Sequence, residues 1–115
     1  MDLKKIKLKL KEFAEERDWE QFHDPKNLSM ALSVEVAELV EIFQWSKSGG
    51  LDEIKDPETK RAIEKEIADI FNYLLKLVDL MDIDLEKASL EKIKENAEKY
   101  PIDLSKGTSK KYRNL

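Results

Sequence analysis

Apolar residues recur every three or four positions along most of the chain, which is the pattern of amphipathic helices. We expect a first helix over residues 2–18, with Asp2 able to cap its start. Its apolar stripe consists of Leu3, Ile6, Leu10 and Phe13. Pro25 disfavours helical backbone in the residue before it. The second helix is therefore expected to begin near Asn27 or Leu28 and to run to about Trp45.

Turn and cap residues place the remaining elements. Ser48-Gly49-Gly50 interrupts the pattern and predicts a loop over residues 46–56 with a short helical turn at 51–54. Asp56-Pro57 is a typical helix start, an acidic cap followed by proline in the first turn. Two further helices are expected, over residues 57–81 and 84–99, the second ending at Tyr100-Pro101.

Four helices joined by short connections predict an all-α fold, a four-helix bundle. The second and third helices carry apolar residues around most of their circumference, whereas a surface helix of a monomer needs only one stripe. We therefore expect a homo-oligomer. The residues concerned are Ala31, Leu32, Val34, Val36, Leu39, Val40, Ile42 and Phe43 on one helix and Ile67, Ile70, Phe71, Leu74, Leu75, Leu77 and Val78 on the other.

Composition limits the remaining choices. The length of 115 residues fits a single domain over 1–115, in which the tail 105–115 can be flexible. The absence of cysteine excludes disulfides and zinc–thiolate sites, and a net charge of −4 argues against nucleic acid as a partner. No apolar run approaches the ~20 residues that span a bilayer, and no signal peptide is evident. We expect a soluble, cytoplasmic protein with no membrane partner.

Two pairs of acidic residues carry the candidate chemistry. Glu35 and Glu38 lie in one apolar helix and Glu66 and Asp69 in the next, and a spacing of three places each pair on one helical face. Such pairs are common on solvated helices. Here, however, apolar neighbours surround all four, and buried carboxylates without partners are unfavourable. Oxygen ligands favour a hard divalent ion, Mg²⁺ before others.

A di-iron centre is the rival explanation for carboxylates on helices. It requires Glu-x-x-His from two helices, and the only histidine, His23, follows Glu20 in the connection after the first helix. A single chain cannot build that site.

Aromatic and basic residues suggest a substrate. Trp19, Phe22, His23 and Trp45 could close the core, or they could provide flat faces on which a nucleobase stacks. Lys92, Asn96 and Lys99 form one polar face of the last helix, either solvated or in contact with phosphate.

Taken together, these motifs resemble the MazG-like family of all-α nucleotide pyrophosphohydrolases, and most closely its dCTP pyrophosphatase branch. The resemblance runs from about Leu8 to Leu115. The segments that carry it are Phe13–Leu28, Glu35–Trp45, Glu66–Leu74, Lys99–Pro101 and Ser109–Tyr112.

The resemblance implies Mg²⁺-dependent hydrolysis of a nucleoside triphosphate, dCTP or a modified dCTP, to the monophosphate and pyrophosphate, a reaction that sanitises the nucleotide pool. It also implies a homotetramer built as a dimer of dimers. By resemblance, the metal ligands and catalytic residues are Glu35, Glu38, Glu66 and Asp69. The substrate-binding residues are Trp19, Glu20, Gln21, Phe22, His23, Trp45, Tyr73, Lys92 and Asn96. The general base is left open among Glu35, Glu38 and Glu66.

One position departs from the family pattern. Animal dCTP enzymes carry a histidine in the first helix where this chain has Leu10, which cannot donate a hydrogen bond to a base or phosphate. Modified dCTPs, other deoxynucleotides or a broader set of substrates therefore stay open. Two alternatives to a dCTP pyrophosphatase also stay open on other grounds. One is a non-catalytic helical interaction protein, and the other is a related hydrolase acting on dUTP or phosphoribosyl-ATP.

Overall fold

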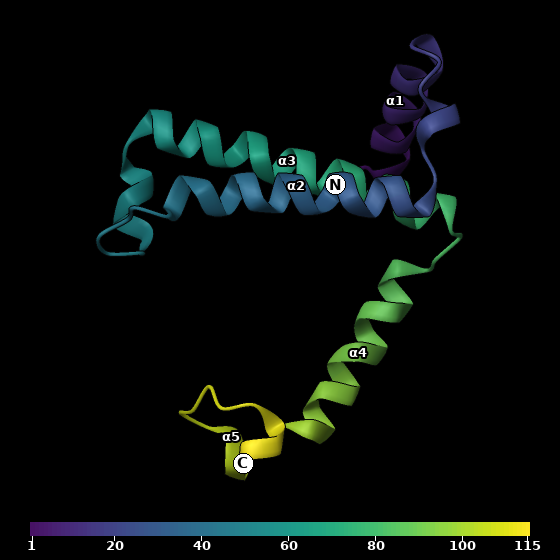
Figure 1. Cartoon of the computed structure of the whole chain (residues 1–115). Coiled ribbons are helices and arrows are strands. Elements are labelled where there is room, and N and C mark those ends of the chain that lie inside the picture. The colour runs from purple at the N-terminus through teal and green to yellow at the C-terminus, as the bar shows by residue number, and fades with distance from the viewer. The chain divides into compact units, whose positions relative to one another are not determined.

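The computed structural model describes residues 1–115 and contains helices and no strand, which confirms the all-α class (Figure 1). Contacts between Cα atoms divide the chain into two compact units, Met1–Asp82 and Ile83–Leu115. No helix has the length and apolar character needed to cross a bilayer.

The first unit is a helical hairpin with a further helix packed on it. Helices α2 and α3 lie side by side and antiparallel, and α1 contacts α3 (Figure 1). The elements are α1 (Leu3–Glu16), the 3-10 turn η1 (Glu20–Phe22), α2 (Pro25–Phe43), the 3-10 turn η2 (Leu51–Lys55) and α3 (Pro57–Leu80).

The second unit consists of one long helix and the chain's C-terminal segment. It contains α4 (Leu85–Lys99), the short α5 (Ile102–Ser105) and the 3-10 turn η3 (Tyr112–Asn114). The Tyr112 ring meets the Tyr100 ring edge-on, with centroids 6.1 Å apart, and the Lys99 ammonium lies 5.2 Å from the Tyr112 centroid. Within this unit the C-terminal residues are thus packed against the end of α4.

Each of the four long helices begins with an aspartate whose carboxylate accepts a hydrogen bond from the backbone N–H three residues later, the usual N-cap arrangement. The caps are Asp2, Asp24, Asp56 and Asp84, with N···O distances of 3.1, 2.7, 3.2 and 3.1 Å. The predicted caps Asp2 and Asp56 are confirmed.

The second helix differs from its prediction at both ends. It starts at Pro25 rather than near Asn27, because Asp24 caps it and proline suits the first helical position, where its missing N–H is not needed. It ends at Phe43 rather than Trp45. The first helix ends at Glu16 rather than residue 18, and α5 was not predicted because four residues carry too little periodicity.

The core of the first unit lies where its three helices meet. Its buried apolar side chains are Ala14, Leu28, Leu75 and Val78. Other large apolar side chains of α2 and α3 are exposed, namely Met30, Val34, Val36, Val40, Ile67 and Leu80. The excess apolar surface inferred from the sequence is therefore present on the isolated chain.

Candidate functional site

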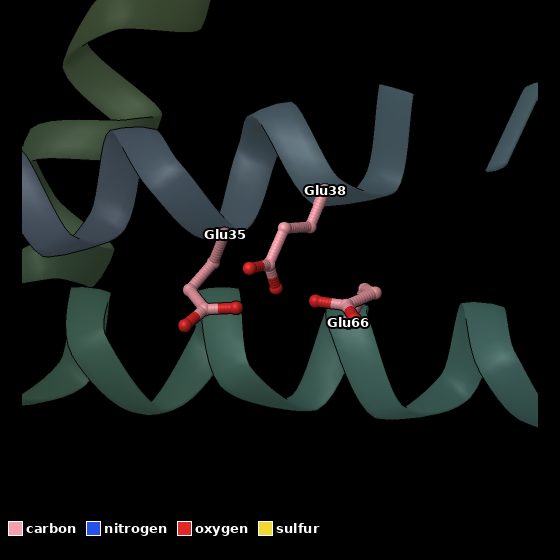
Figure 2. Close-up of side chains that lie close together, drawn as sticks. All are labelled: Glu35, Glu38 and Glu66. Carbon is pink, nitrogen blue, oxygen red and sulfur yellow. The ribbon is translucent and has the colours of Figure 1, made fainter. Parts of the chain in front are cut away.

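Three of the four predicted carboxylates converge between α2 and α3. Glu35 and Glu38 come from α2 and Glu66 from α3, and Figure 2 shows their carboxylates directed toward one another. One oxygen of each residue lies within 4.8 Å of those of the other two. The antiparallel packing of the two helices brings together acids that are about thirty residues apart in the sequence.

The triad is partly buried and incompletely satisfied. Glu35 and Glu66 are half-buried, while Glu38 is exposed. The Oε2 atom of Glu35 and the Oε2 atom of Glu66 are shielded from solvent and form no hydrogen bond. Buried carboxylate oxygens without a partner are unfavourable, and proteins satisfy them with hydrogen bonds, ion pairs or a bound metal ion.

The pKa values reflect this crowding. Burial raises the pKa of Glu35 from 4.5 to about 7, and hydrogen bonding and charge repulsion from Glu38 add to the effect. Burial and the neighbouring Glu38 also raise the pKa of Glu66. A divalent cation between the carboxylates would reverse this repulsion, so the all-oxygen triad fits a hard metal ion.

Asp69 is not part of the triad. Its carboxylate lies beside Glu35 on the wall of an adjoining cavity. The negative charge of Asp69 nevertheless acts on the site, because it helps to raise the pKa values of Glu35, Glu66 and Tyr73. The structure therefore places the fourth predicted acid at the junction between the carboxylate cluster and the cavity.

The cavity beside Asp69 has a volume of about 320 Å³ and combines an aromatic wall with a polar one. It lies between α1, the residues on either side of η1, α2 and the middle of α3. Its lining residues are Leu10, Phe13, Ala14, Trp19, His23, Glu35, Asp69, Asn72, Tyr73 and Lys76. We call it the acidic-end cavity.

A second cavity of about 300 Å³ adjoins the first. The two share Leu10, His23 and Lys76 in their linings. The second also includes Glu20 and is bordered by three lysines in all, Lys7, Lys11 and the shared Lys76. We call it the lysine-rich cavity.

The turn after α1 positions Trp19. Asp18 adopts a positive φ of 55°, which reverses the chain, and the Trp19 N–H donates to the Ala14 carbonyl at 2.9 Å. The indole then meets the Phe13 ring edge-on, with centroids 5.6 Å apart. Both rings line the acidic-end cavity, so this turn gives the cavity a fixed aromatic wall.

The other predicted pocket residues are distributed unevenly. His23 lines both cavities, Glu20 lines the lysine-rich cavity, and Tyr73 lines the acidic-end cavity. Gln21 donates a hydrogen bond to the Asp18 carbonyl and so supports the turn. In the isolated chain Phe22 is 58% exposed and Trp45 is 85% exposed, and neither lines a cavity.

The predicted phosphate residues Lys92 and Asn96 belong to the second unit. Lys92 and Lys99 both pair with Glu95, with N···O distances of 3.3 and 3.2 Å. Glu95 therefore occupies the middle of the basic face of α4.

The sequence did not identify four residues of the acidic-end cavity as pocket residues, namely Phe13, Ala14, Asn72 and Lys76. A signal for the last two was present. Asn72 and Lys76 follow Asp69 by three and seven residues, which continues the same face of α3 beyond the acidic pair.

Comparisons with known proteins agree with this arrangement. The MazG-like family matches residues 30–115. The chain is similar to dCTP pyrophosphatase 1 of rat and of human, with 43% identity over 105 residues in each case and 90% of this chain covered. It spans only 62% of the length of these curated relatives.

A solved structure shares the fold. The crystal structure of a pyrophosphatase from Archaeoglobus fulgidus superimposes with a TM-score of 0.74 and 41% sequence identity. The match covers 85% of this chain and 91% of that one.

Proposed function

The chain belongs to the MazG-like family, and from that premise we propose that it is a Mg²⁺-dependent nucleoside triphosphate pyrophosphohydrolase. Its proposed substrate is dCTP or a modified dCTP, which it would convert to the monophosphate and pyrophosphate. The names of the relatives, dCTP pyrophosphatase 1 and pyrophosphatase, support both the reaction and the base.

The observation that carries the proposal is the carboxylate triad placed directly beside a cavity with aromatic walls. Glu35 belongs to both, so a ligand in the acidic-end cavity reaches the metal-binding oxygens. Acids alone would suit many metal sites. The adjoining Trp19 and Phe13 rings specify a ligand with a flat apolar part, which a nucleotide has.

The metal is proposed to be Mg²⁺, held by Glu35, Glu38 and Glu66, with Asp69 at the edge of the site. When bound, Mg²⁺ supplies Lewis-acid neutralisation of the charge on the triphosphate and of the charge that develops as it is cleaved. Four acidic side chains would repel a free triphosphate, so substrate binding requires the ion.

The chain's own residues would orient the substrate. Trp19 stacks against the base, with the Phe13 ring edge-on beside it. Tyr73, one turn beyond Asp69 on the same face of α3, lies at the level of the sugar. One carboxylate among Glu35, Glu38 and Glu66 accepts the proton of the attacking water as general base. Lys92 and Asn96 are proposed to contact phosphate, with Glu95 neutralising Lys92 in the free protein.

We also propose a single domain over residues 1–115 that assembles as an oligomeric four-helix bundle, a dimer of dimers. The family match from 30 to 115 includes residues of both compact units, which supports one domain. The exposed apolar side chains of α2, including Val34 at 55% and Val40 at 60%, support a second copy as their burial partner.

The decisive experiment incubates the purified protein with a panel of deoxynucleoside triphosphates and Mg²⁺ and separates pyrophosphate from orthophosphate. We expect pyrophosphate and dCMP from dCTP, and no product with EDTA. Glu38→Gln should abolish turnover while remaining folded, and Glu41→Gln on the same helix serves as the matched control. Orthophosphate as the product, or full activity of Glu38→Gln, would refute the proposal. If dUTP were the only nucleotide hydrolysed, the proposed reaction would stand and the proposed substrate would change from dCTP to dUTP.

A further inference from the structure

The polar wall of the acidic-end cavity has an order along α3. Asp69 adjoins the carboxylate triad, Asn72 and Tyr73 follow, and Lys76 comes last. Asp69 and Lys76 are separated by about two helical turns, or ~10 Å along the helix axis, and therefore share one face. A nucleotide whose phosphates lie at the acids and which extends along α3 would place its sugar near Tyr73 and its base near Lys76.

Lys76 is available to a ligand. It is half-buried and lines both cavities where they adjoin. The nearby carboxylate of Asp79 pairs instead with Lys7, at 3.5 Å, and Lys76 takes part in no ion pair of the chain. A partly buried ammonium without a carboxylate partner has its three donors free for a ligand.

Lys76 is the one lysine that lines the acidic-end cavity. Lys7 and Lys11 line only the lysine-rich cavity, and they pair with Asp79 and Glu15. Leu10 lines both cavities, as Lys76 does, but its side chain has no hydrogen-bond donor. Burial lowers the pKa of His23, and the ammonium of Lys76 lowers it further, so this imidazole is neutral near pH 7. The charge of Lys76 therefore acts on a group inside the cavity. The Nδ1 atom of the same His23 is buried without a hydrogen-bond partner.

We propose that Lys76 is a specificity-determining residue that donates a hydrogen bond to the base of the bound nucleotide. An ammonium only donates, so it favours a base edge with acceptors. Cytosine has an acceptor at N3 beside its O2 acceptor, whereas uracil carries an N–H at N3 and keeps acceptors only at its carbonyls O2 and O4. The proposed hydrogen bond runs from the Lys76 ammonium to N3, where cytosine accepts and uracil does not, and through this bond Lys76 favours cytosine over uracil. This inference rests on the proposed function, since it assigns the base end of the same site.

The test compares steady-state kinetics of the full-length wild type and Lys76→Met with dCTP and dUTP. Loss of a hydrogen bond to a charged group should raise KM for dCTP roughly 10- to 100-fold. The kcat value should change little, and the preference for dCTP over dUTP should collapse. Lys76→Arg, which keeps a donor and the charge, should retain part of that preference. Lys60→Met replaces an exposed lysine of α3 outside both cavities and should behave as wild type.

A base-free analogue, deoxyribose 5′-triphosphate, separates base recognition from phosphate binding. As an inhibitor it should bind wild type and Lys76→Met equally well. If Lys76→Met weakened the binding of the analogue as much as the binding of dCTP, Lys76 would contact phosphate and the inference would be wrong. An unchanged or increased dCTP preference in Lys76→Met, with a wild-type melting temperature, would also overturn it while leaving the proposed function intact. A wild type that releases pyrophosphate from no nucleotide would refute both.

Discussion

Replacing Glu35 with glutamine is expected to stabilise the metal-free protein above neutral pH and to remove its response to Mg²⁺. Glu35 is the acid whose environment opposes ionisation most clearly. Burial raises its pKa to about 7, and Glu38 and Asp69 oppose its charge further. The neutral amide has nearly the same shape and needs no counter-charge.

The direction in which stability changes with pH follows from proton linkage. Between pH 4.5 and about pH 7 the folded state holds a proton on Glu35 that the unfolded state has already released. Stability therefore falls as the pH rises through this interval and stays reduced above it. At 1.36 kcal/mol for each pH unit, the largest possible loss is about 3 kcal/mol. The site opens to solvent, so screening reduces the expected loss to roughly 1–2 kcal/mol.

The assay is calorimetric unfolding in EDTA over a pH series that brackets this interval, for wild type, Glu35→Gln and the control Glu41→Gln. At about 4 °C for each kcal/mol, Glu35→Gln should melt roughly 4–8 °C above wild type at alkaline pH. The two should converge at acidic pH, where Glu35 is protonated. Adding Mg²⁺ should raise the melting temperature of wild type and Glu41→Gln, because a ligand of the native state stabilises it.

Parallel pH curves for wild type and Glu35→Gln would refute this reasoning. They would mean that Glu35 ionises in the folded protein as freely as in the unfolded chain, and hence that the carboxylates are not crowded. A Mg²⁺ response that survives in Glu35→Gln would remove Glu35 from the metal site.

Four further outcomes are expected. Trp19→Ala should weaken dCTP binding by about 1–3 kcal/mol through loss of base stacking, measured by isothermal titration with Ca²⁺ replacing Mg²⁺ to slow turnover; unchanged affinity would exclude Trp19 from the pocket. Leu28→Ala removes a side chain that is only 1% exposed and should cost about 2–5 kcal/mol in urea unfolding. Asp56→Ala removes the cap of α3, whose carboxylate accepts from the Thr59 N–H and hydroxyl, and should cost about 1 kcal/mol by the same measurement. Val40→Glu should shift the protein to smaller species in analytical ultracentrifugation, and an unchanged mass would show that this face of α2 is not an interface.

Much of the fold was predictable because local signals were strong. The Asp56-Pro57 start of α3 was identified from residues that act within one turn, and the structure confirms it. The convergence of Glu35, Glu38 and Glu66 followed from two i,i+3 pairs on helices joined by a short loop. Helices in such a hairpin have few ways to pack, so facing acids were the expected result.

The rest depended on tertiary detail that spacing does not encode. Asp69 carries the same i,i+3 signal as Glu66, yet it lines the cavity with Glu35 and is not one of the three mutually close acids, because the packing of α2 against α3 decides which acid of α3 meets both Glu35 and Glu38. Lys76 was overlooked because a lysine in an amphipathic helix is usually solvated, and only the position of α1 encloses it. Trp45 was expected in the pocket but lies exposed beyond α2 in the isolated chain.

Placing Glu66, Asp69, Tyr73 and Lys76 on one continuous helix has an evolutionary consequence. Because each residue turns the helix by about 100°, one residue inserted between Asp69 and Lys76 would carry Lys76 away from the cavity wall. A substitution at Lys76, in contrast, leaves both acids of α3 where they are. Related sequences can therefore diverge in the nucleotide they accept through point changes at this position, whereas the length of α3 between these residues should be invariant among those that share the site.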